Sequence, residues 1–302
     1  MPLVPCYRGS VNAWECDEND HLNVRFYVAK ANQGLPFVLD AMGLPASLLR
    51  EKNLRPRVRA QHIRFLEESR PATPLTVMAA LASDASHQLT IYSEVRHSLN
   101  GAVLAALLTE IEMIGPDGAP RAVIASRDAP RFAVPEHGSP RGIPAARESL
   151  RPAYEQIADM GFVEIGRGTV GPAECDADGE MELFQYVGRM SESVVNLLAH
   201  FQTEEELSRR STGVEGGALV ELRVTFHAPL RTGSQFTIHS GIAAVARKTQ
   251  HFVHLFFDET SRACVATARG VAVAMDLKSR KSIELPEARR RRIEAGLLRL
   301  PR

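Results

Sequence analysis

Two patterns of apolar and polar residues run along this chain, and each pattern occurs in both halves. Over residues 183–201, apolar side chains recur every three or four positions, which predicts an amphipathic helix. These apolar residues are Val187, Met190, Val194, Leu197, Leu198 and Phe201. The first half predicts a similar helix over 24–42, with a kink or break at Gly34-Leu35-Pro36 and a C-terminal cap at Gly43.

Each predicted helix is followed by apolar or alternating runs that are typical of β-strands. The strands are expected over 75–81, 88–95 and 103–114 in the first half, and over 236–245, 251–257 and 263–275 in the second. Asn100-Gly101 is typical of a hairpin turn. A short strand is expected before each helix, over 8–15 and 167–174. One long helix followed by antiparallel strands indicates an α+β fold rather than a doubly wound parallel sheet.

An internal repeat relates the two halves. At an offset of 159 residues, 8 of the 21 positions from Arg8 to Val28 are identical, where unrelated sequences give about one or two matches. The identical residues are Arg8, Gly9, Val11, Glu15, Cys16, Asp17, Tyr27 and Val28. The similarity continues at an offset of 161, so the second half has two extra residues between its helix and its sheet. The residues that match at this offset are Phe65, Arg70, Thr76 and Ala102.

The repeat predicts two like domains in tandem. We expect the first over 1–140, a Pro-rich linker over 141–160, and the second over 161–302, which ends in a basic C-terminal tail. A length of 302 residues suits two domains, each large enough to bury its own core.

Composition excludes several classes of partner and cofactor. The 36 basic and 36 acidic residues cancel, so no overall field favours nucleic acid or an anionic membrane as a partner. The four cysteines form no CxxC pair, and no nucleotide-binding glycine motif occurs, so no metal and no cofactor are expected. There is no signal-like start and no apolar run near 18 residues, so we expect a cytoplasmic protein with reduced thiols.

The segment before the first helix carries a distinctive set of polar residues. It reads Asp17-Glu18-Asn19-Asp20-His21-Leu22-Asn23, with Tyr27 following on the helix. This stretch resembles the signature of hotdog-fold acyl-CoA thioesterases of the 4-hydroxybenzoyl-CoA thioesterase type, with Asp20 at the place of the family glycine. The Asp, His, Asn and Tyr of that signature are present.

The second half carries a modified copy of the same stretch. Asp176 and Gly179 are kept, but Glu180 and Glu182 stand where the signature has His and Asn. The resemblance covers both halves and implies two tandem hotdog domains, each a long helix wrapped by an antiparallel sheet. It also implies that they form an internal pseudo-dimer, with sites that combine the Asp loop of one half with strands of the other. A further homo-dimer is left open.

Asp17 is the candidate catalytic carboxylate, because thioester hydrolysis needs a group that attacks the carbonyl or activates water. The backbone N–H groups near Asn23 and Val24 start a helix and are expected to stabilise the oxyanion. His21 and Asn23 are expected to orient water or bind the carbonyl, and Asp176 is the matching carboxylate of the second half. The alternatives are structural: Asp17 or Glu15 satisfies loop backbone, His21 is solvated, and Asn23 caps the helix.

Substrate contacts are expected from Glu15 and Tyr27, although a helix Tyr packed on the sheet is the alternative for the latter. Arg247-Lys248-Thr249 resembles a family segment near the site, so Arg247 is expected to meet a CoA phosphate and Thr249 the attacking water. The alternative for this segment is a strand-end turn with solvated cations.

Three other features are not expected to carry the chemistry. Cys16 is expected to face away from Glu15 and Asp17 and to pack as a small apolar group. His251 and His254 are three apart on a strand and so point to opposite faces, which argues against a metal pair. The Arg289–Arg292 run is expected on a solvated helix face rather than as a phosphate clamp.

The sequence thus predicts a thioesterase that hydrolyses an acyl-CoA to the free acid and CoA in lipid metabolism. The second site is expected to be degenerate, because Glu180 and Glu182 would repel a developing oxyanion. One alternative is a non-catalytic acyl-CoA-binding protein. Another is a hotdog hydratase or dehydratase, whose His-containing motifs are missing here. The acyl group is not specified, and the carrier is either CoA or acyl carrier protein.

Overall fold

The computed structural model describes residues 3–85, 88–144 and 150–301. The chain divides into two compact units, Met1–Arg141 (unit 1) and Gly142–Arg302 (unit 2). Residues 145–149 of the predicted linker lie outside the described residues, as do Met1 and Pro2. From Leu150 onwards the chain packs on unit 2, where Ile157 is part of a buried apolar cluster.

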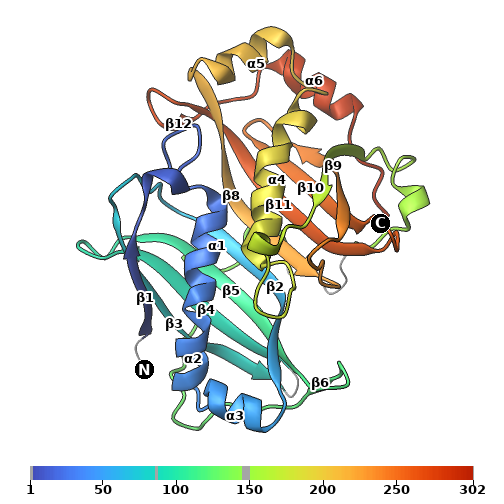
Figure 1. The fold of residues 1–302 in the computed structure, drawn as a ribbon. Coiled ribbons are helices and arrows are strands. Elements are labelled where there is room, and N and C mark those ends of the chain that lie inside the picture. Colours follow the sequence, from blue (N-terminus) through green and yellow to red (C-terminus); the bar gives the residue numbers. More distant parts are fainter. Residues whose placement is uncertain (1–2, 86–87, 145–149, 302) are drawn as a thin grey trace. The chain divides into compact units, whose positions relative to one another are not determined.

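Unit 1 is an antiparallel sheet with helices packed on it (Figure 1). Its helices are α1 (Val24–Gln33), α2 (Leu35–Ala41) and α3 (Ala46–Glu51). Its strands are β1 (Val4–Ser10), β2 (Arg55–Phe65), β3 (Pro74–Ala85), β4 (Gln88–His97), β5 (Val103–Ile114) and β6 (Pro120–Arg121). The strand order is β1-β3-β4-β5-β2, and β6 pairs with β5.

Unit 2 repeats this plan. Its helices are α4 (Leu183–Leu198), α5 (Glu204–Ser211) and α6 (Glu287–Ala295). Its strands are β7 (Val163–Thr169), β8 (Glu215–Phe226), β9 (Gln235–Val245), β10 (Thr249–Asp258), β11 (Cys264–Asp276) and β12 (Lys281–Ser282). The order is β8-β11-β10-β9-β7, with β12 paired to β11. The two tandem repeats are therefore the same α+β fold, a hotdog, as the sequence predicts.

The predicted break in the first helix is confirmed. α1 ends at Gln33 and α2 begins at Leu35, because Pro36 has no backbone N–H to continue the hydrogen bonds of α1. Gly43 has φ +80°, the left-handed conformation of a C-terminal cap. Unit 2 has Ser193 and Val195 at the positions of Gly34 and Pro36, so α4 runs unbroken over 16 residues.

The strands after each helix are confirmed, but each sheet has one more strand than the pattern shows. β2 and β8 follow the helices in sequence and lie at the end of their unit's sheet, beside β5 and β11. The sequence Arg55-Pro56-Arg57-Val58-Arg59 hides β2, because basic residues break the apolar alternation. The strand expected over 8–15 is also wrong in its bounds: β1 ends at Ser10, and Ala13–Glu15 form a 3₁₀ turn.

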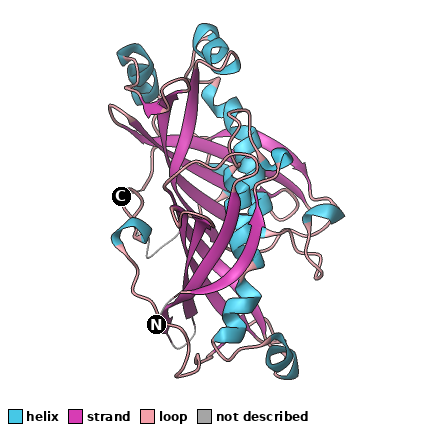
Figure 2. Ribbon diagram, turned by 90° about the vertical axis from the view of Figure 1, so that its left-hand side faces the viewer, coloured by secondary structure: helices cyan, strands magenta, loops and turns pink. Residues whose placement is uncertain are grey.

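Each sheet has one face against the long helix of its unit, and Figure 2 shows the helices in cyan beside the magenta strands. On this face Tyr27 of α1 packs edge-on against Phe65, with ring centroids 5.6 Å apart. Tyr186 of α4 packs in the same way against Phe226 and Phe256, at 5.4 Å each. The helix Tyr of the repeat therefore anchors the helix to the sheet in both units.

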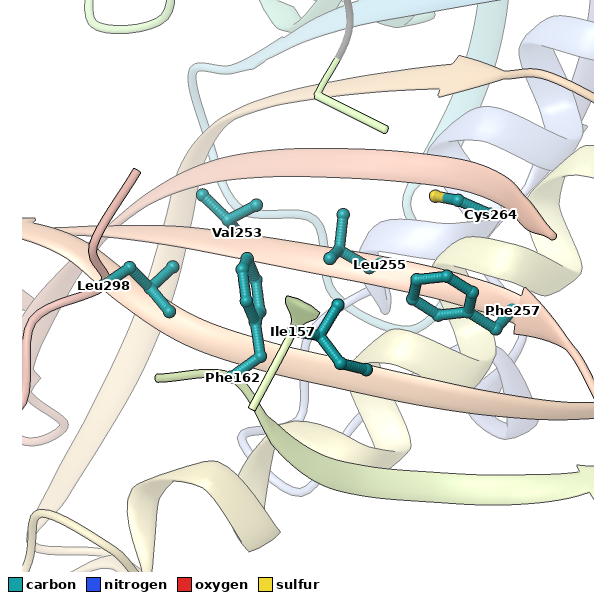
Figure 3. Close-up of a cluster of buried hydrophobic side chains, with 7 residues drawn as sticks. All are labelled: Ile157, Phe162, Val253, Leu255, Phe257, Cys264 and Leu298. Carbon is teal, nitrogen blue, oxygen red and sulfur yellow. The ribbon is translucent and has the colours of Figure 1, made fainter. Parts of the chain in front are cut away.

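The other face of the unit 2 sheet is covered by chain segments outside the sheet. Figure 3 shows Ile157, Phe162 and Leu298 packed over β10. Their partners on and beside this strand are Val253, Leu255, Phe257 and Cys264. In unit 1 the segment after β6 covers the sheet similarly, and Phe132 stacks on Tyr92 at 5.8 Å. Each unit thus has its own apolar core.

No helix in the described part of the chain is long and apolar enough to cross a membrane.

Candidate active site

The loop from Asp17 to Leu22 is a tight turn closed by backbone hydrogen bonds. Asp17 N–H donates to the His21 carbonyl at 2.8 Å, and Cys16 forms a β-bridge with Leu22. The Asp17 carboxylate oxygen Oδ1 accepts from Asn19 N–H at 2.9 Å and from His21 N–H at 3.3 Å. Within the described residues, Oδ2 of Asp17 accepts no hydrogen bond. One oxygen therefore orders the loop, and the other is available for chemistry.

The glycine of the family signature has a conformational reason. Asp20 has φ +60° and Gly179, its counterpart in unit 2, has φ +72°. Asp is one of the residues that adopt this left-handed conformation at modest cost, so the replacement of Gly by Asp20 keeps the turn. The Asp20 carboxylate also pairs with Arg70 at 3.2 Å.

Asn23 caps the start of α1, which is the structural alternative given above to a role in binding the carbonyl. Its side chain caps the helix by accepting from Arg25 N–H at 3.1 Å. Its own N–H donates to the Glu15 carbonyl at 2.9 Å, so this group is occupied and the expectation of an oxyanion donor there is wrong. Val24 is the first helical residue, and its N–H has no acceptor within the helix. Val24 N–H is thus the backbone donor that the start of α1 offers after the Asp17 loop.

His21 lies at the end of the loop and is mostly buried. Its Nε2 lies 3.0 Å from Oε2 of Glu68. A carboxylate at this distance fixes the orientation of the imidazole ring. The ring is therefore held in place beside the Asp17 turn.

Tyr27 supports the loop from the core. Its side chain is 4% exposed, and its hydroxyl donates to Ser69 Oγ at 3.1 Å and approaches the Glu67 carbonyl at 3.4 Å. The Ser69 carbonyl in turn accepts from Leu22 N–H at 2.8 Å. Burial raises the pKa of Tyr27 to about 12, so it is a neutral donor. This is the packed arrangement given above as the alternative to a substrate contact.

Glu15 forms a buried ion pair with Lys30, a residue that the sequence pattern did not single out. Lys30 Nζ lies 2.7 Å from Oε1 and 2.9 Å from Oε2 of Glu15. The position equivalent to Lys30 in the second half is Arg189, so the repeat places a basic residue there in both halves. This shared basic residue is the sequence feature that could have predicted the ion pair. Glu15 is engaged by Lys30 rather than open to a substrate.

The Asp176 loop of unit 2 has the same backbone. Asp176 Oδ1 accepts from Asp178 N–H at 2.9 Å and from Glu180 N–H at 3.0 Å, and Cys175 bridges Met181. Its side chains differ, since Glu180 pairs with Arg231 at 2.6 Å where unit 1 has His21.

The helix start of unit 2 also differs. Glu182 precedes α4 and makes no side-chain cap hydrogen bond. Burial and then the charge of Asp176 raise the pKa of the Glu182 carboxyl. A carboxylate therefore lies where unit 1 has the neutral cap Asn23. Of the two carboxylates expected to repel an oxyanion, Glu182 lies at the helix start, whereas Glu180 is paired with Arg231.

Cys16 is unsuited to act as a nucleophile. Its Sγ lies 3.6 Å from the Asn12 carbonyl. Burial, followed by the charges of Asp20, Asp17 and Glu15, raises the pKa of its thiol. The thiolate is the reactive form, and it is therefore disfavoured. The expected strand alternation does not apply here, because the preceding residues form a 3₁₀ turn.

Arg247 lies in the turn that joins β9 to β10, and Thr249 is the first residue of β10. Arg247 is 71% exposed in its side chain and lies 3.4 Å from Glu284. The Asp176 loop contacts Arg231, before the other end of β9. The 11 residues of β9 span roughly 33 Å, so unit 2 does not bring this turn to its own Asp loop. Their roles with phosphate and water stay predictions.

The two histidines of β10 have different surroundings. His254 is buried, and its Nδ1 lies 2.7 Å from Ser240 Oγ, whereas His251 is half-buried. In the described part of the chain, no group of three or more His, Cys, Asp and Glu side chains is arranged to hold a metal ion.

The arginine run in α6 is divided between a buried, paired side and an exposed side that carries Arg291. Arg289 is 2% exposed and binds Glu215 and Glu206, and Arg292 also binds Glu206, at 2.5 Å. The expectation of a solvated face is therefore wrong for Arg289. This segment docks α6 onto α5 and β8 and is not an exposed basic tail.

Comparisons with known proteins agree with this fold. A model of the thioesterase-like superfamily matches residues 11–118 and 170–293, one region in each unit. No curated protein matches the chain.

Several solved structures resemble the chain over most of its length. One is provisionally described as an oleoyl thioesterase from Lactobacillus plantarum, with a TM-score of 0.67, 14% identity, and coverage of 93% of this chain and 97% of that one. Another is an acyl-ACP thioesterase from Bacteroides thetaiotaomicron, with a TM-score of 0.63, 13% identity and coverage of 88% and 96%. A third is the 12:0-ACP thioesterase from Umbellularia californica, with a TM-score of 0.64, 9% identity and coverage of 88% and 92%. At these identities the likeness is one of fold.

The superfamily model covers both Asp loops, both long helices and the strands that follow them. The chain therefore belongs to the thioesterase-like superfamily.

Proposed function

We propose that this protein is a thioesterase of the 4-hydroxybenzoyl-CoA thioesterase type that hydrolyses an acyl-CoA at the Asp17 loop. Membership of the thioesterase-like superfamily supports hydrolysis of a thioester as the reaction. The observation that carries the choice of site is the neutral Asn23 cap at the helix start after the Asp17 loop, where unit 2 has the Glu182 carboxylate. In the Asp17 loop, Oδ1 of the carboxylate is held by two backbone N–H groups, while Oδ2 is unengaged among the described residues.

In the general-base form of the mechanism, Asp17 Oδ2 removes a proton from a water molecule as its oxygen attacks the thioester carbonyl. The carbonyl oxygen gains a negative charge, which Val24 N–H and the positive end of α1 stabilise. The intermediate then collapses, the carbon–sulfur bond breaks, and the thiolate takes the proton from Asp17. The products are the free acid and CoA. In the nucleophilic form, Oδ2 itself attacks, the carbon–sulfur bond breaks and the thiolate leaves, which gives an anhydride of Asp17 and the acyl group. Water then hydrolyses this anhydride to the free acid and the Asp17 carboxylate, and the proton released protonates the thiolate.

His21 has a supporting role in this proposal. With Nε2 directed to Glu68, its ring is fixed beside the Asp17 loop, and we propose that the imidazole orients the attacking water. Asn23 acts through its cap, which fixes the start of α1 and hence the direction of Val24 N–H.

Unit 2 is proposed to be a structural partner with a degenerate loop. Asp176 has the same hydrogen bonds as Asp17, but Glu182 places a carboxylate at the helix start. Negative charge there offsets the positive potential that an oxyanion needs. The internal pairing of the two domains stays a prediction of the resemblance.

The carrier of the acyl group is the main alternative. Two of the structures with a similar fold are acyl-ACP thioesterases, so acyl carrier protein competes with CoA as the carrier. We retain the cytoplasm as the proposed location, because all four cysteines are free thiols, which suits a reducing compartment.

The test is a panel of thioesters assayed by release of free thiol. Acyl groups of increasing length are presented on CoA, on acyl carrier protein and on N-acetylcysteamine. We expect hydrolysis of at least one acyl-CoA with kcat/KM above its acyl carrier protein counterpart. A higher kcat/KM for the acyl carrier protein thioester would contradict CoA as the carrier and identify acyl carrier protein instead. Failure with every thioester, by a folded protein, would contradict the proposed reaction.

A further inference from the structure

The Asp17 loop is backed by a buried ammonium group that the mechanism above does not use. Lys30 is 3% exposed, although Lys is rarely buried in proteins unless it is paired. Besides the two oxygens of Glu15, its Nζ donates to the Ser10 carbonyl at 3.2 Å. The Tyr7 ring covers it, with Nζ 5.7 Å from the ring centroid. The buried ammonium group is thus paired with a carboxylate, hydrogen-bonded to a carbonyl and packed beside an aromatic ring.

Glu15, which Lys30 holds in place, is hydrogen-bonded to the segments before and after the Asp17 loop. Its carboxylate oxygen Oε2 accepts from Asn12 N–H at 2.8 Å, which holds the 3₁₀ turn. Its carbonyl accepts from Asn23 N–H at 2.9 Å, which closes the base of the loop at the start of α1. Asp17 lies two residues after Glu15, and Val24 lies one residue after Asn23. The Glu15–Lys30 pair therefore sets where the carboxylate stands relative to the helix N–H.

Unit 2 preserves the same network with a different cation. Arg189 Nε donates to Glu174 Oε1 at 2.9 Å, and Glu174 Oε2 accepts from Gly171 N–H at 2.8 Å. The Glu174 carbonyl accepts from Glu182 N–H at 2.9 Å. Three links of the unit 1 network thus recur at an offset of 159 residues: the cation to the carboxylate, the carboxylate to the turn N–H, and the Glu carbonyl to the N–H at the helix start. The two networks share a cation on the helix, while the residue type that supplies it changes.

We propose that Lys30 is a positioning residue that acts through Glu15 to hold Asp17 in register with the Val24 N–H. This inference rests on the proposed function, because it concerns the geometry of the same loop. Lys30 does not touch the substrate. Its role is to place the Asp17 carboxylate and the Val24 N–H so that both can contact one thioester group. Small errors in such placement lower the rate by large factors.

The test uses the double variant Glu15→Gln/Lys30→Met in the full chain. Removing both charges leaves no unpaired buried ion, so the variant is expected to fold. We expect kcat to fall by about tenfold to a hundredfold with little change in KM, since the misplacement affects the transition state. Hydrogen exchange of the amides of residues 16–23 is expected to rise by about tenfold.

Two controls separate positioning from general damage. Lys30→Arg keeps the cation and is expected to hold kcat within about threefold of the wild type. Glu174→Gln/Arg189→Met makes the matched change in unit 2, and we expect faster exchange over 175–182 without a change in kcat. A folded Glu15→Gln/Lys30→Met variant with wild-type kcat and unchanged exchange would overturn the inference.

Non-additivity supplies the decisive readout. In an Asp17→Asn background, the Glu15→Gln/Lys30→Met change is expected to have no further effect on the residual rate, because its target is already gone. Full additivity would mean that Lys30 acts by another route and would overturn the inference. An inactive wild type, or an Asp17→Asn variant of wild-type activity, would instead overturn the proposed function, while the exchange data would still report on the loop.

Discussion

The two Asp loops of this chain share a backbone and differ in their charges. Asp17 and Asp176 each accept two backbone N–H groups on Oδ1. In unit 1 the loop continues into a neutral cap, whereas in unit 2 Glu182 stands there with its pKa raised by burial and by Asp176. The shared loop geometry therefore follows from the backbone hydrogen bonds that the Asp side chain accepts in both units, and it does not by itself indicate activity in either.

The comparison also shows the structural role of the duplicated Asp. Its first role is to order the turn, which the sequence offered as the structural alternative. This role is compatible with catalysis in unit 1, because it occupies one carboxylate oxygen and leaves the other. A repeated residue is thus weak evidence of a repeated activity.

The largest effect that separates the units is expected in stability. Lys30→Met leaves Glu15 buried without its cation and is expected to cost about 3–5 kcal/mol. Arg189→Met is expected to cost about 1 kcal/mol, because its side chain is 31% exposed and its ion pairs are screened. Denaturant unfolding followed by hydrogen exchange in α1 and α4 measures both. Equal losses would remove this difference between the units.

A pH-dependent difference is expected from unit 2. Burial lowers the pKa of His254 from 6.5 to about 4, and the equivalent residue of unit 1 is Ser93. Below pH 6.5 the unfolded chain binds a proton that the folded chain does not. Stability is therefore full above about pH 6.5 and falls by about 3 kcal/mol as the pH drops to about 4.

His254→Asn removes the titrating ring and keeps a partner for Ser240. We expect the difference in unfolding free energy between wild type and variant to depend on pH over this window, with the wild type losing stability relative to the variant as the pH falls. A constant difference from pH 7 to pH 4 would show that His254 is not held neutral in the fold.

The helix tyrosines are expected to have smaller and unequal effects. Tyr186→Phe leaves the buried Leu230 N–H without its acceptor and is expected to cost about 1–3 kcal/mol. Tyr27→Phe removes a donor to Ser69 and is expected to cost about 1 kcal/mol, with activity within about threefold of wild type. A hundredfold loss of kcat in Tyr27→Phe would place its hydroxyl in the reaction and break this account of the residue.

The smallest effect concerns the exposed turn between β9 and β10. If Arg247 meets a CoA phosphate, Arg247→Ala raises KM for acyl-CoA by about threefold, as expected for an exposed ion pair. The KM of the matching N-acetylcysteamine thioester, which has no nucleotide phosphates, is expected to stay constant. Glu284→Gln is the matched control, because Glu284 is the partner of Arg247 in this structure. Equal changes for both substrates would exclude the phosphate contact.

The fold was predictable because the repeat and the apolar spacing both report on burial. The break at Gly34-Leu35-Pro36 and the strand over 103–114 follow from single residues and alternation, and both are confirmed. The sequence pattern did not predict β2, because Arg55, Arg57 and Arg59 occupy alternate positions along this strand. A strand whose alternate positions are long cations does not show the apolar period.

The candidate site was predictable only in part. Asp17 and the helix start follow from the signature, but the hydrogen bond from Asn23 N–H to Glu15 O depends on how the 3₁₀ turn folds back. Lys30 is distant from Glu15 in sequence, and an isolated Lys in a helix is usually solvated. The buried pair became visible only with the three-dimensional structure, although Arg189 at the equivalent position was a signal.

The central claim is that one of two alike loops catalyses thioester hydrolysis, and paired carboxamide variants test it most directly. Asp17→Asn and Asp176→Asn each keep an acceptor for the loop N–H groups and remove a carboxylate. On the best substrate, we expect Asp17→Asn to lower kcat/KM by at least about a hundredfold and Asp176→Asn by less than about threefold. Equal losses would mean two working sites, and a loss confined to Asp176→Asn would contradict the assignment of the active loop to unit 1.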